Sequence, residues 1–239
     1  MDESMQTTKE ADVETPLFSL KMIAEVNMPT RWANFRMLGF EAVRQQENSG
    51  RRYTETALVL ILGDIHVAPP IVRIHSQCAT GDIFHSLRCD CHDQLHLALR
   101  TIADEGAGIL LYEHQEGRGI GLMEKLRAYA LQDQGLDTIE ANLQLGHAVD
   151  TRDFQLPVRI LQFLQISSLR LMTNNPQKIA TIQSAGIKLV ERVAADVASS
   201  PHAAGYLATK REKLGHIYAG HTPANAVGCE LNPVYSLAK

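Results

Sequence analysis

The sequence predicts a mixed α/β (α+β) fold, in which helices flank one mixed sheet. Runs typical of antiparallel strands fill the first third of the chain, and strand and helix patterns alternate after it, as in βα units. With 45% hydrophobic and 21% charged residues among 239, the chain can bury a sizeable core. We expect one domain over 16–218, between a disordered polar tail over 1–15 and an extension over 219–239.

The first third of the domain is expected to contain strands. The apolar runs that predict them cover residues 20–26, 33–40, 57–62 and 71–74. The polar stretch 45–52 predicts a loop between the second and third of these strands. The last run follows Pro69-Pro70 and leads directly into a group of cysteines.

The later elements alternate between helix and strand. Helical spacing of apolar residues predicts helices over 95–105, 122–133, 153–164 and 176–184. Short apolar runs predict strands over 108–112, 169–172 and 187–193. Gly106 and Gly135 are expected to end the first two helices, and Asn175-Pro176 to begin the fourth. This alternation favours parallel strands in the second part of the sheet.

Charge and hydropathy argue against several classes of protein. The formal net charge of -4 and the pI of about 6.2 disfavour a broad nucleic-acid-binding face. The longest apolar run, 57–62, is far shorter than the roughly 20 residues that cross a bilayer. The first fifteen residues carry five acids and one lysine, the opposite of a signal peptide. We expect a cytoplasmic protein without nucleic-acid or membrane partners.

The strongest chemical signal is a group of three cysteines, Cys78, Cys89 and Cys91, within fourteen residues. Clustered cysteines in a cytosolic protein more often bind metal or do chemistry than form disulfides. Three thiolates can hold a zinc ion and leave a fourth position for water, whose pKa zinc lowers to about 7. Two alternatives stay open. The thiols could be free and buried, or a structural zinc could take a fourth ligand from His75, His85 or His92.

A glycine-rich segment follows the strand expected over 108–112, with the sequence Glu116-Gly117-Arg118-Gly119-Ile120-Gly121. Glycines let a backbone approach a phosphate closely, and a guanidinium can grip it bidentately. The helix expected next would favour an anion at its N-terminus. Such turns are also common without a ligand. The segment is not a Walker loop, because the Gly-Lys-Ser/Thr ending is absent.

Two further segments carry polar residues next to predicted elements. Residues 150–154 (DTRDF) could hold catalytic groups, or could simply cap a helix with solvated charges. Residues 173–178 (TNNPQK) follow a strand and could form a plain turn, or a loop in which Thr173 and Lys178 reach a phosphate. The residues alone leave both questions open.

Taken in chain order, these segments resemble GTP cyclohydrolase II from about residue 20 to residue 218, without a large gap. The matching motifs are RIHSQC (73–78), TGD (80–82), SLRCDC (86–91), QEGRGIGL (115–122), RAYALQD (127–133), Asp150-x-Arg152, TNNPQK (173–178) and a C-terminal segment, YLATKREKLGH (206–216). Several independent motifs in the right order make a chance match very improbable.

The resemblance implies roles for individual residues. Cys78, Cys89 and Cys91 match the zinc ligands. The matching nucleotide-binding positions are Arg73, Ile74, His75, Ser76, Gln77, Gln94, Glu116, Gly117, Arg118, Thr138, Thr173 and Lys178. Asp150 matches the proton acceptor, Arg152 the nucleophile toward the α-phosphate, and Tyr129 a further catalytic residue. A guanidinium with a pKa above about 12 is a poor nucleophile, so we expect Arg152 to clamp the phosphate instead.

The resemblance also implies a reaction and its cofactors. Enzymes of this family release formate and pyrophosphate from GTP and leave a diaminopyrimidinone ribosyl phosphate, the first step of riboflavin biosynthesis. They use zinc, need magnesium for the triphosphate and are typically homodimers. For this chain the implied partners are therefore GTP or a related purine nucleotide, one zinc ion, magnesium and a second copy of the chain.

Three positions depart from the usual family sequence. Gln77 replaces a Glu before the first cysteine, His92 a Gly after the third, and His114 a common Arg. We expect His92 to line the pocket rather than bind the zinc, because ligation by adjacent residues is sterically awkward. The departures are compatible with ordinary activity. They also leave open a paralogue that acts on another purine nucleotide or retains the formyl group, and a nucleotide-binding regulator without turnover. The retained cysteines and catalytic residues argue against the regulator.

Overall fold

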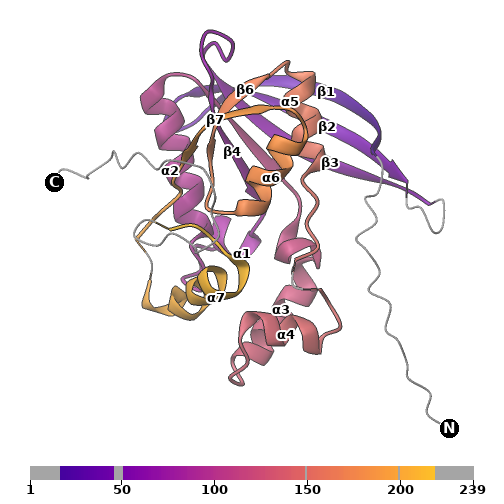
Figure 1. Cartoon of the computed structure of the whole chain (residues 1–239), viewed down its shortest axis with the longest axis vertical. Helices are drawn as coiled ribbons and strands as arrows, with labels where there is room; N and C mark the ends of the chain where they lie inside the picture. Colours follow the sequence, from indigo (N-terminus) through magenta and orange to yellow (C-terminus); the bar gives the residue numbers. More distant parts are fainter. Residues whose placement is uncertain (1–16, 46–50, 149, 199, 219–239) are drawn as a thin grey trace.

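The computed structural model describes residues 17–45, 51–148, 150–198 and 200–218. The tail expected over 1–15 and the extension expected over 219–239 lie outside these residues. Figure 1 shows the sheet with the helices packed on it and gathered at one of its ends. In the part of the chain that is described, no helix has the length and apolar character needed to cross a membrane.

A seven-stranded mixed sheet forms the centre of the described residues, in the order β1-β2-β3-β5-β4-β6-β7. The strands are β1 (Leu17–Pro29), β2 (Asn34–Gln45), β3 (Arg52–Leu62), β4 (Ile71–Ser76), β5 (Gly108–Glu113), β6 (Ser168–Met172) and β7 (Lys188–Val193). The pairs β1–β2, β2–β3 and β3–β5 are antiparallel, whereas β4–β5, β4–β6 and β6–β7 are parallel. The predicted mixed sheet, with antiparallel strands first, is confirmed.

The α-helices are α1 (Ala79–Asp82), α2 (Cys91–Glu105), α3 (Leu122–Gln132), α4 (Thr138–Gln144), α5 (Gln155–Phe163), α6 (Pro176–Ser184) and α7 (Ala204–Leu214). Two short 3-10 helices, η1 (Glu116–Gly119) and η2 (Pro201–Ala203), also occur among the described residues. The four predicted helices correspond to α2, α3, α5 and α6, although α2 already begins at Cys91. Helices α1, α4 and α7 were not predicted.

The ends of several helices follow from local sequence. Asn175 caps α6 by accepting a hydrogen bond from the Gln177 amide, and Pro176 occupies its first turn. Gly106 ends α2 in the left-handed conformation. Helix α4 has a capping box, in which Asp137 and Glu140 each bond the other's backbone amide. This Asp-x-x-Glu signal could have revealed α4 from the sequence.

Two apolar clusters fix the helices on opposite faces of the sheet. On one face, α5 and α6 contribute residues such as Ile160 and Ile182 against Val72 and Leu111. On the other face, α2 packs Ile102 and its neighbours against the sheet. Ile160 and Leu111 are fully buried, and burying such a side chain contributes about 1.5–3 kcal/mol. The sheet is therefore held rigidly from both sides.

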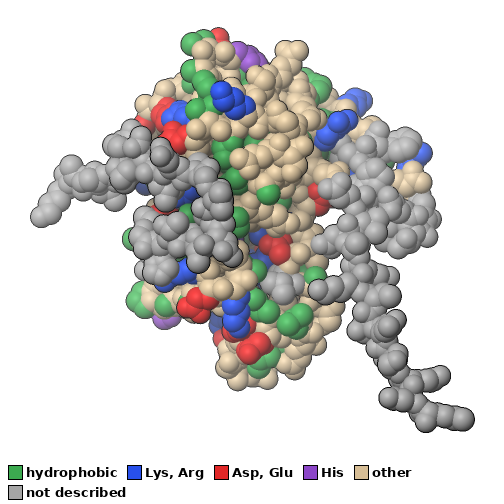
Figure 2. All heavy atoms as spheres, viewed as in Figure 1, with side chains coloured by type: hydrophobic (Ala, Val, Ile, Leu, Met, Phe, Trp, Pro, Cys, Tyr) green, Lys and Arg blue, Asp and Glu red, His purple; other side chains and the backbone are tan. Residues whose placement is uncertain are grey.

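The candidate site lies at the end of the sheet where β4 and β5 finish. These strands are parallel neighbours, with Ser76 paired to Glu113 at their carboxyl ends. The cysteine segment follows β4, and the glycine-rich segment follows β5. Helices α3, α4 and α7 gather near this end of the sheet (Figure 1). On the face in Figure 2, acidic and basic side chains are interspersed over the described residues, without one extended patch of either sign.

The interpretation of residues 150–154 as a cap with solvated charges needs correction. Helix α5 begins at Gln155, and Phe154 occupies its N-cap position. Asp153 does accept a hydrogen bond from the Gln155 amide at 2.7 Å. Asp150 and Arg152, however, are only 17% and 13% exposed and bind each other. Packing over the end of the sheet, which a local charge pattern does not reveal, removes this pair from solvent.

Candidate functional site

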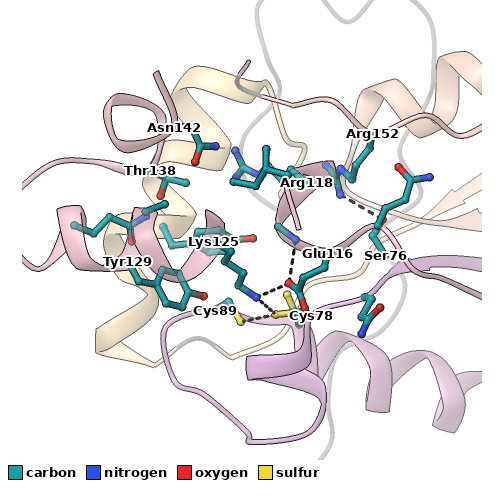
Figure 3. A pocket seen from close by; sticks show the side chains of 18 residues that line it. Ser76, Cys78, Cys89, Glu116, Arg118, Lys125, Tyr129, Thr138, Asn142 and Arg152 are labelled. Carbon is teal, nitrogen blue, oxygen red and sulfur yellow. Dashed lines mark hydrogen bonds and ion pairs between the residues drawn. The ribbon is translucent and has the colours of Figure 1, made fainter. Parts of the chain in front are cut away.

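One pocket collects residues from both loops and from the three helices at this end of the sheet (Figure 3). Its lining residues are Ser76, Gln77, Cys78, Cys89, Cys91, Gln115, Glu116, Gly117, Arg118, Ile120, Lys125, Ala128, Tyr129, Gln132, Thr138, Asn142, Arg152 and Tyr206. The three cysteines, the glycine-rich loop and the 150–154 segment therefore meet in one place, although up to 74 residues separate them in sequence.

The three cysteines form a compact donor set. The sulfurs of Cys78, Cys89 and Cys91 all lie within 4.8 Å of one another. Gly81 in α1 packs directly against them, since a Cβ at this position would lie 3.0 Å from the Cys89 sulfur and 3.2 Å from the Cys78 sulfur. A soft trio of thiols with space between them suits zinc, which prefers thiolate ligands. The residues present therefore fit a zinc ion.

Without a bound metal, the surroundings of the trio favour ionisation of the Cys78 thiol first. Hydrogen bonds from Cys89 and Cys91, helped by the ammonium of Lys125, hold the pKa of the Cys78 thiol well below its ordinary value. The hydrogen bond to Cys78 raises the pKa of Cys89 to about 11. Burial opposes a charge on Lys125, but the neighbouring thiolate and Glu116 outweigh it and raise the pKa of the lysine.

A buried polar chain supports the turn between the second and third cysteines. Asp90 accepts a hydrogen bond from Lys210 of α7 at 2.8 Å and another from Gln94 at 2.7 Å. Arg73 in turn donates to Gln94 at 2.7 Å and to the Met172 carbonyl at 3.1 Å. The predicted nucleotide-binding residues Arg73 and Gln94 therefore lie behind the cysteines, where they position the turn.

The glycine-rich loop has an unusual backbone. Gly117 and Arg118 both adopt the left-handed conformation, with φ of 62° and 61°. For arginine this conformation is uncommon and is found mostly where surrounding contacts enforce it. Gly119 also has a positive φ, and a Cβ there would lie 2.3 Å from the Thr151 hydroxyl oxygen. The loop thus turns the Arg118 side chain into the pocket.

The Arg118 guanidinium reaches the pocket without a protein acceptor. Both of its terminal nitrogens are buried, and neither finds a hydrogen-bond partner among the described residues. Its closest aromatic neighbour is Tyr206 of α7, whose ring centroid lies 5.8 Å from the guanidinium carbon. Buried donors of this kind are costly unless a ligand or water satisfies them. The arrangement therefore favours an anionic ligand at this position.

A second arginine lies beside the first, already bound to a carboxylate. Arg152 donates from Nε to Asp150 Oδ1 at 2.9 Å and from Nη2 to Oδ2 at 2.5 Å. Its Nη1 approaches the Ser76 hydroxyl at 3.5 Å. Burial alone would raise the pKa of Asp150, but hydrogen bonds and charge from Arg152 outweigh it and lower that pKa. The pair is thus an ion pair at neutral pH.

The wall of the pocket opposite the sheet comes from α3 and α4. Tyr129 lies between two cations, with Arg88 4.9 Å and Lys125 5.7 Å from its ring centroid. Burial raises the pKa of Tyr129, so its phenol keeps its proton at neutral pH. Thr138 and Asn142 lie one turn apart on α4 and also line the pocket. The side-chain Oδ1 of Asn142 is buried and, like the terminal nitrogens of Arg118, lacks a partner among the residues described.

Other predicted nucleotide-binding residues lie behind the pocket rather than in its wall. Lys178 donates to the Ile74 carbonyl at 2.8 Å, and burial lowers its pKa well below the ordinary value. His75 contacts Asp82 at 3.1 Å. The Thr173 hydroxyl accepts a hydrogen bond from the Asn175 amide, within the turn before α6. By contrast, Ser76, Gln77, Glu116, Gly117, Arg118 and Thr138 line the pocket.

The three departures from the usual family sequence have different surroundings. Gln77 and His114 contact each other, with 2.9 Å between the amide oxygen and His114 Nδ1, so these two departures form one pair. The expectation that His92 lines the pocket is wrong. Its ring lies in tilted contact with the rings of His85 and His96, at centroid distances of 3.8 and 3.9 Å, and it belongs neither to the pocket wall nor to the metal-ligand group found among the described residues.

Sequence reasoning assigned no site role to seven of the residues that line the pocket. These are Gln115, Ile120, Lys125, Ala128, Gln132, Asn142 and Tyr206. Two of them carried a signal, because Lys125 precedes Tyr129 by one helical turn and Asn142 follows Thr138 by one turn. A lysine or asparagine in an amphipathic helix is normally solvated, so the side chains alone did not indicate a pocket. Tyr206 lies in the C-terminal motif, to which no role had been assigned.

Comparison with known proteins gives a consistent result. The sequence profile of the GTP cyclohydrolase II family matches residues 21–194. The GTP cyclohydrolase-2 of Enterobacter sp. (strain 638) is 50% identical over 199 residues, which cover 83% of this chain and 97% of that protein. The GTP cyclohydrolase-2 of Hamiltonella defensa is 48% identical over 201 residues, covering 84% of this chain and 98% of its own.

Among solved structures, a two-domain 3,4-dihydroxy-2-butanone 4-phosphate synthase from A. baumannii matches with a TM-score of 0.39 and 14% identity. The match covers 77% of this chain and 41% of that structure. The likeness is too weak to carry an argument.

Proposed function

This chain belongs to the GTP cyclohydrolase II family and is an enzyme of that type, and on this premise we propose that its pocket opens the imidazole ring of GTP and removes pyrophosphate. One observation carries the proposal for the site. A group of three thiols and an unsatisfied, buried guanidinium line the same pocket. A purine nucleoside triphosphate has a base at one end and phosphates at the other, which matches this division.

Arg118 and Arg152 are the proposed phosphate contacts. A guanidinium binds a phosphate through two parallel, charge-assisted hydrogen bonds. Arg118 is already turned into the pocket without an acceptor, and Arg152 lies on the same lining with Asp150 as its partner. In the proposed step a water attacks the α-phosphorus and pyrophosphate leaves, and we assign Arg152 to clamping the α-phosphate and stabilising the charge that develops on the leaving group. Magnesium would offset the remaining charge of the triphosphate.

The base is placed at the cysteine end. Cys78, Cys89 and Cys91 would hold a zinc ion, which when bound activates water at neutral pH. In the proposed reaction a first water adds to the carbon between the imidazole nitrogens and the ring opens to a formamide. A second water cleaves the formamide and releases formate. Ala128 and Ile120 supply the apolar part of the wall that would exclude further water.

Asp150 and Tyr129 are suited to complementary proton transfers. Asp150 is ionised and becomes available as a proton acceptor when Arg152 turns to the phosphate. Tyr129 keeps its proton and can donate a hydrogen bond to a developing negative charge. Neither role requires the arginine to form a covalent bond. The homodimer stays a prediction from the resemblance, and the cytoplasmic location stays a prediction from the charge and hydropathy of the sequence.

The test is product analysis. We expect purified protein with GTP and magnesium to release formate and pyrophosphate in equal amounts, and to contain about one zinc per chain. A product that keeps the formyl group would identify a paralogue with shortened chemistry. Tight GTP binding without turnover would identify a regulator. Full activity in a zinc-free preparation would contradict the assigned role of the cysteines.

A further inference from the structure

Lys125 occupies an unusual position for a lysine. It lies on α3, on the pocket wall, and only 9% of its surface is exposed. Its ammonium donates a hydrogen bond to the Cys78 sulfur at 3.0 Å and another to Glu116 Oε1 at 2.7 Å (Figure 3). A buried ammonium is stable only with compensating charges and hydrogen bonds. Here they come from a metal-binding thiol and from the loop that carries Arg118.

Glu116 extends this contact in two directions. Its Oε2 accepts a hydrogen bond from the Ala79 amide at 2.6 Å, directly after Cys78. Its Oε1 accepts from the Gly117 amide at 2.9 Å, at the start of the left-handed loop. Both carboxylate oxygens are therefore occupied by protein donors. Because both oxygens already have protein partners, the Glu116 carboxylate is better suited to holding the loop in place than to binding the nucleotide.

Together these contacts form one continuous connection from the metal site to the phosphate loop. Cys78 and Ala79 lie at one end, Gly117 and Arg118 at the other, and the Lys125–Glu116 ion pair joins them. Three thiolates around a divalent cation carry a net negative charge, so an adjacent ammonium stabilises the group by charge and by an N–H···S hydrogen bond.

We propose that Lys125 is a positioning residue that retains the metal at Cys78 and, through Glu116, holds the Gly117–Arg118 loop in its nucleotide-binding shape. The proposal rests on the proposed function, because it assumes a zinc ion on the three cysteines. Lys125 thereby couples the two ends of the pocket. Removal of the ammonium should therefore speed the release of the metal and also raise the KM for GTP.

The variants are chosen to separate positioning from folding. Lys125→Met removes the ammonium and keeps the length of the side chain, but it leaves Glu116 buried without a counterion. The double variant Lys125→Met/Glu116→Gln removes both charges and avoids that penalty. Lys125→Arg keeps the charge and tests partial rescue. Lys188→Met is the matched control, since Lys188 is exposed on β7, at the far edge of the sheet.

The main measurement is the rate at which zinc-loaded full-length protein releases its metal to a chromophoric chelator. Loss of a contact to a metal ligand typically costs 10–100-fold in affinity, so we expect release about 10–100-fold faster in Lys125→Met and in the double variant. Lys125→Arg should fall between them and the wild type, and Lys188→Met should match the wild type. In the cobalt-substituted protein, loss of the N–H···S bond should shift the thiolate-to-cobalt charge-transfer band. The KM for GTP should rise in both variants that lack the ammonium.

The outcomes separate this proposal from the proposed function. Wild-type protein that holds no zinc would contradict the metal site itself. If the wild type holds zinc and turns over GTP, but the folded double variant keeps the wild-type release rate and charge-transfer band, Lys125 does not position the metal. If metal release accelerates while the KM for GTP is unchanged in the double variant, the coupling to the loop is wrong.

Discussion

The two ends of the pocket differ in how completely their polar groups are satisfied. At the cysteine end, Cys78, Lys125 and Glu116 contact one another, and Asp90 is held by Lys210. At the other end, the terminal nitrogens of Arg118 and the side-chain amide oxygen of Asn142 are buried without a partner among the described residues. One end is preorganised by the protein itself, and the other has donors and an acceptor in place for a ligand.

This difference indicates that the cysteine end favours retention of a metal and that the arginine end favours binding of a ligand. A preorganised group of ligands loses little entropy when a metal binds, which favours retention. Unsatisfied polar atoms at the nucleotide end destabilise the free protein slightly, and their satisfaction strengthens binding of a molecule with matching groups. Substitutions at the two ends should therefore affect different measurements: metal content at the cysteine end, and GTP kinetics at the arginine end.

The largest effect is expected at the cysteine end. Cys89→Ser should abolish both zinc binding and ring opening, because two thiolates and a hydroxyl form a much weaker zinc site. Elemental analysis of the purified variant, together with formate release from GTP, measures both. A Cys89→Ser protein that keeps one zinc and normal turnover would show that the metal is held elsewhere.

Substitution of Lys178, which lies behind the pocket, should lower the stability of the fold rather than the metal content. Lys178→Ala removes a buried side chain and leaves the Ile74 carbonyl without its donor. We expect the free energy of unfolding to fall by about 2–5 kcal/mol, the range for truncating a long buried side chain. Urea denaturation followed by circular dichroism gives this value. If the free energy of unfolding is unchanged and the KM for GTP rises, Lys178 contacts the triphosphate directly.

Arg118→Ala is the matching change at the nucleotide end. Because Arg118 has no described protein partner for its terminal nitrogens, its loss should hardly change stability. We expect kcat/KM for GTP to fall by an amount equivalent to about 1.5–3 kcal/mol, the range for a charge-assisted hydrogen bond. Zinc content should match the wild type. Normal steady-state kinetics would mean that the triphosphate lies elsewhere.

The smallest effect is expected at His92, which follows a cysteine but is not among the residues that line the pocket. His92→Gly removes a ring that contacts the rings of His85 and His96. Zinc content should stay at one per chain, and GTP turnover should change by less than about tenfold, or 1.4 kcal/mol. A change from no activity to vigorous formate release would show that this histidine closes the site in the native protein.

Most element types and the motifs that carry the proposed chemistry could be predicted from the sequence alone. Apolar periodicity located the strands and four helices, because the packing of a sheet between helices requires those patterns. The motifs identified the cysteines, the glycine-rich loop and the Asp150–Arg152 pair. Helix α4 was missed although its capping box was readable, whereas α7 has a weak apolar face.

Which of these residues form the pocket wall could not be predicted from the sequence, because it depends on how the elements pack. Arg73, Gln94 and Lys178 lie behind the wall, although they belong to the same motifs as residues that line it. Lys125 became part of the site because α3 packs over the cysteines, a contact that no local pattern encodes. The physical reason is that burial, and hence the role of a charged side chain, depends on neighbours distant in sequence that only the folded chain brings together.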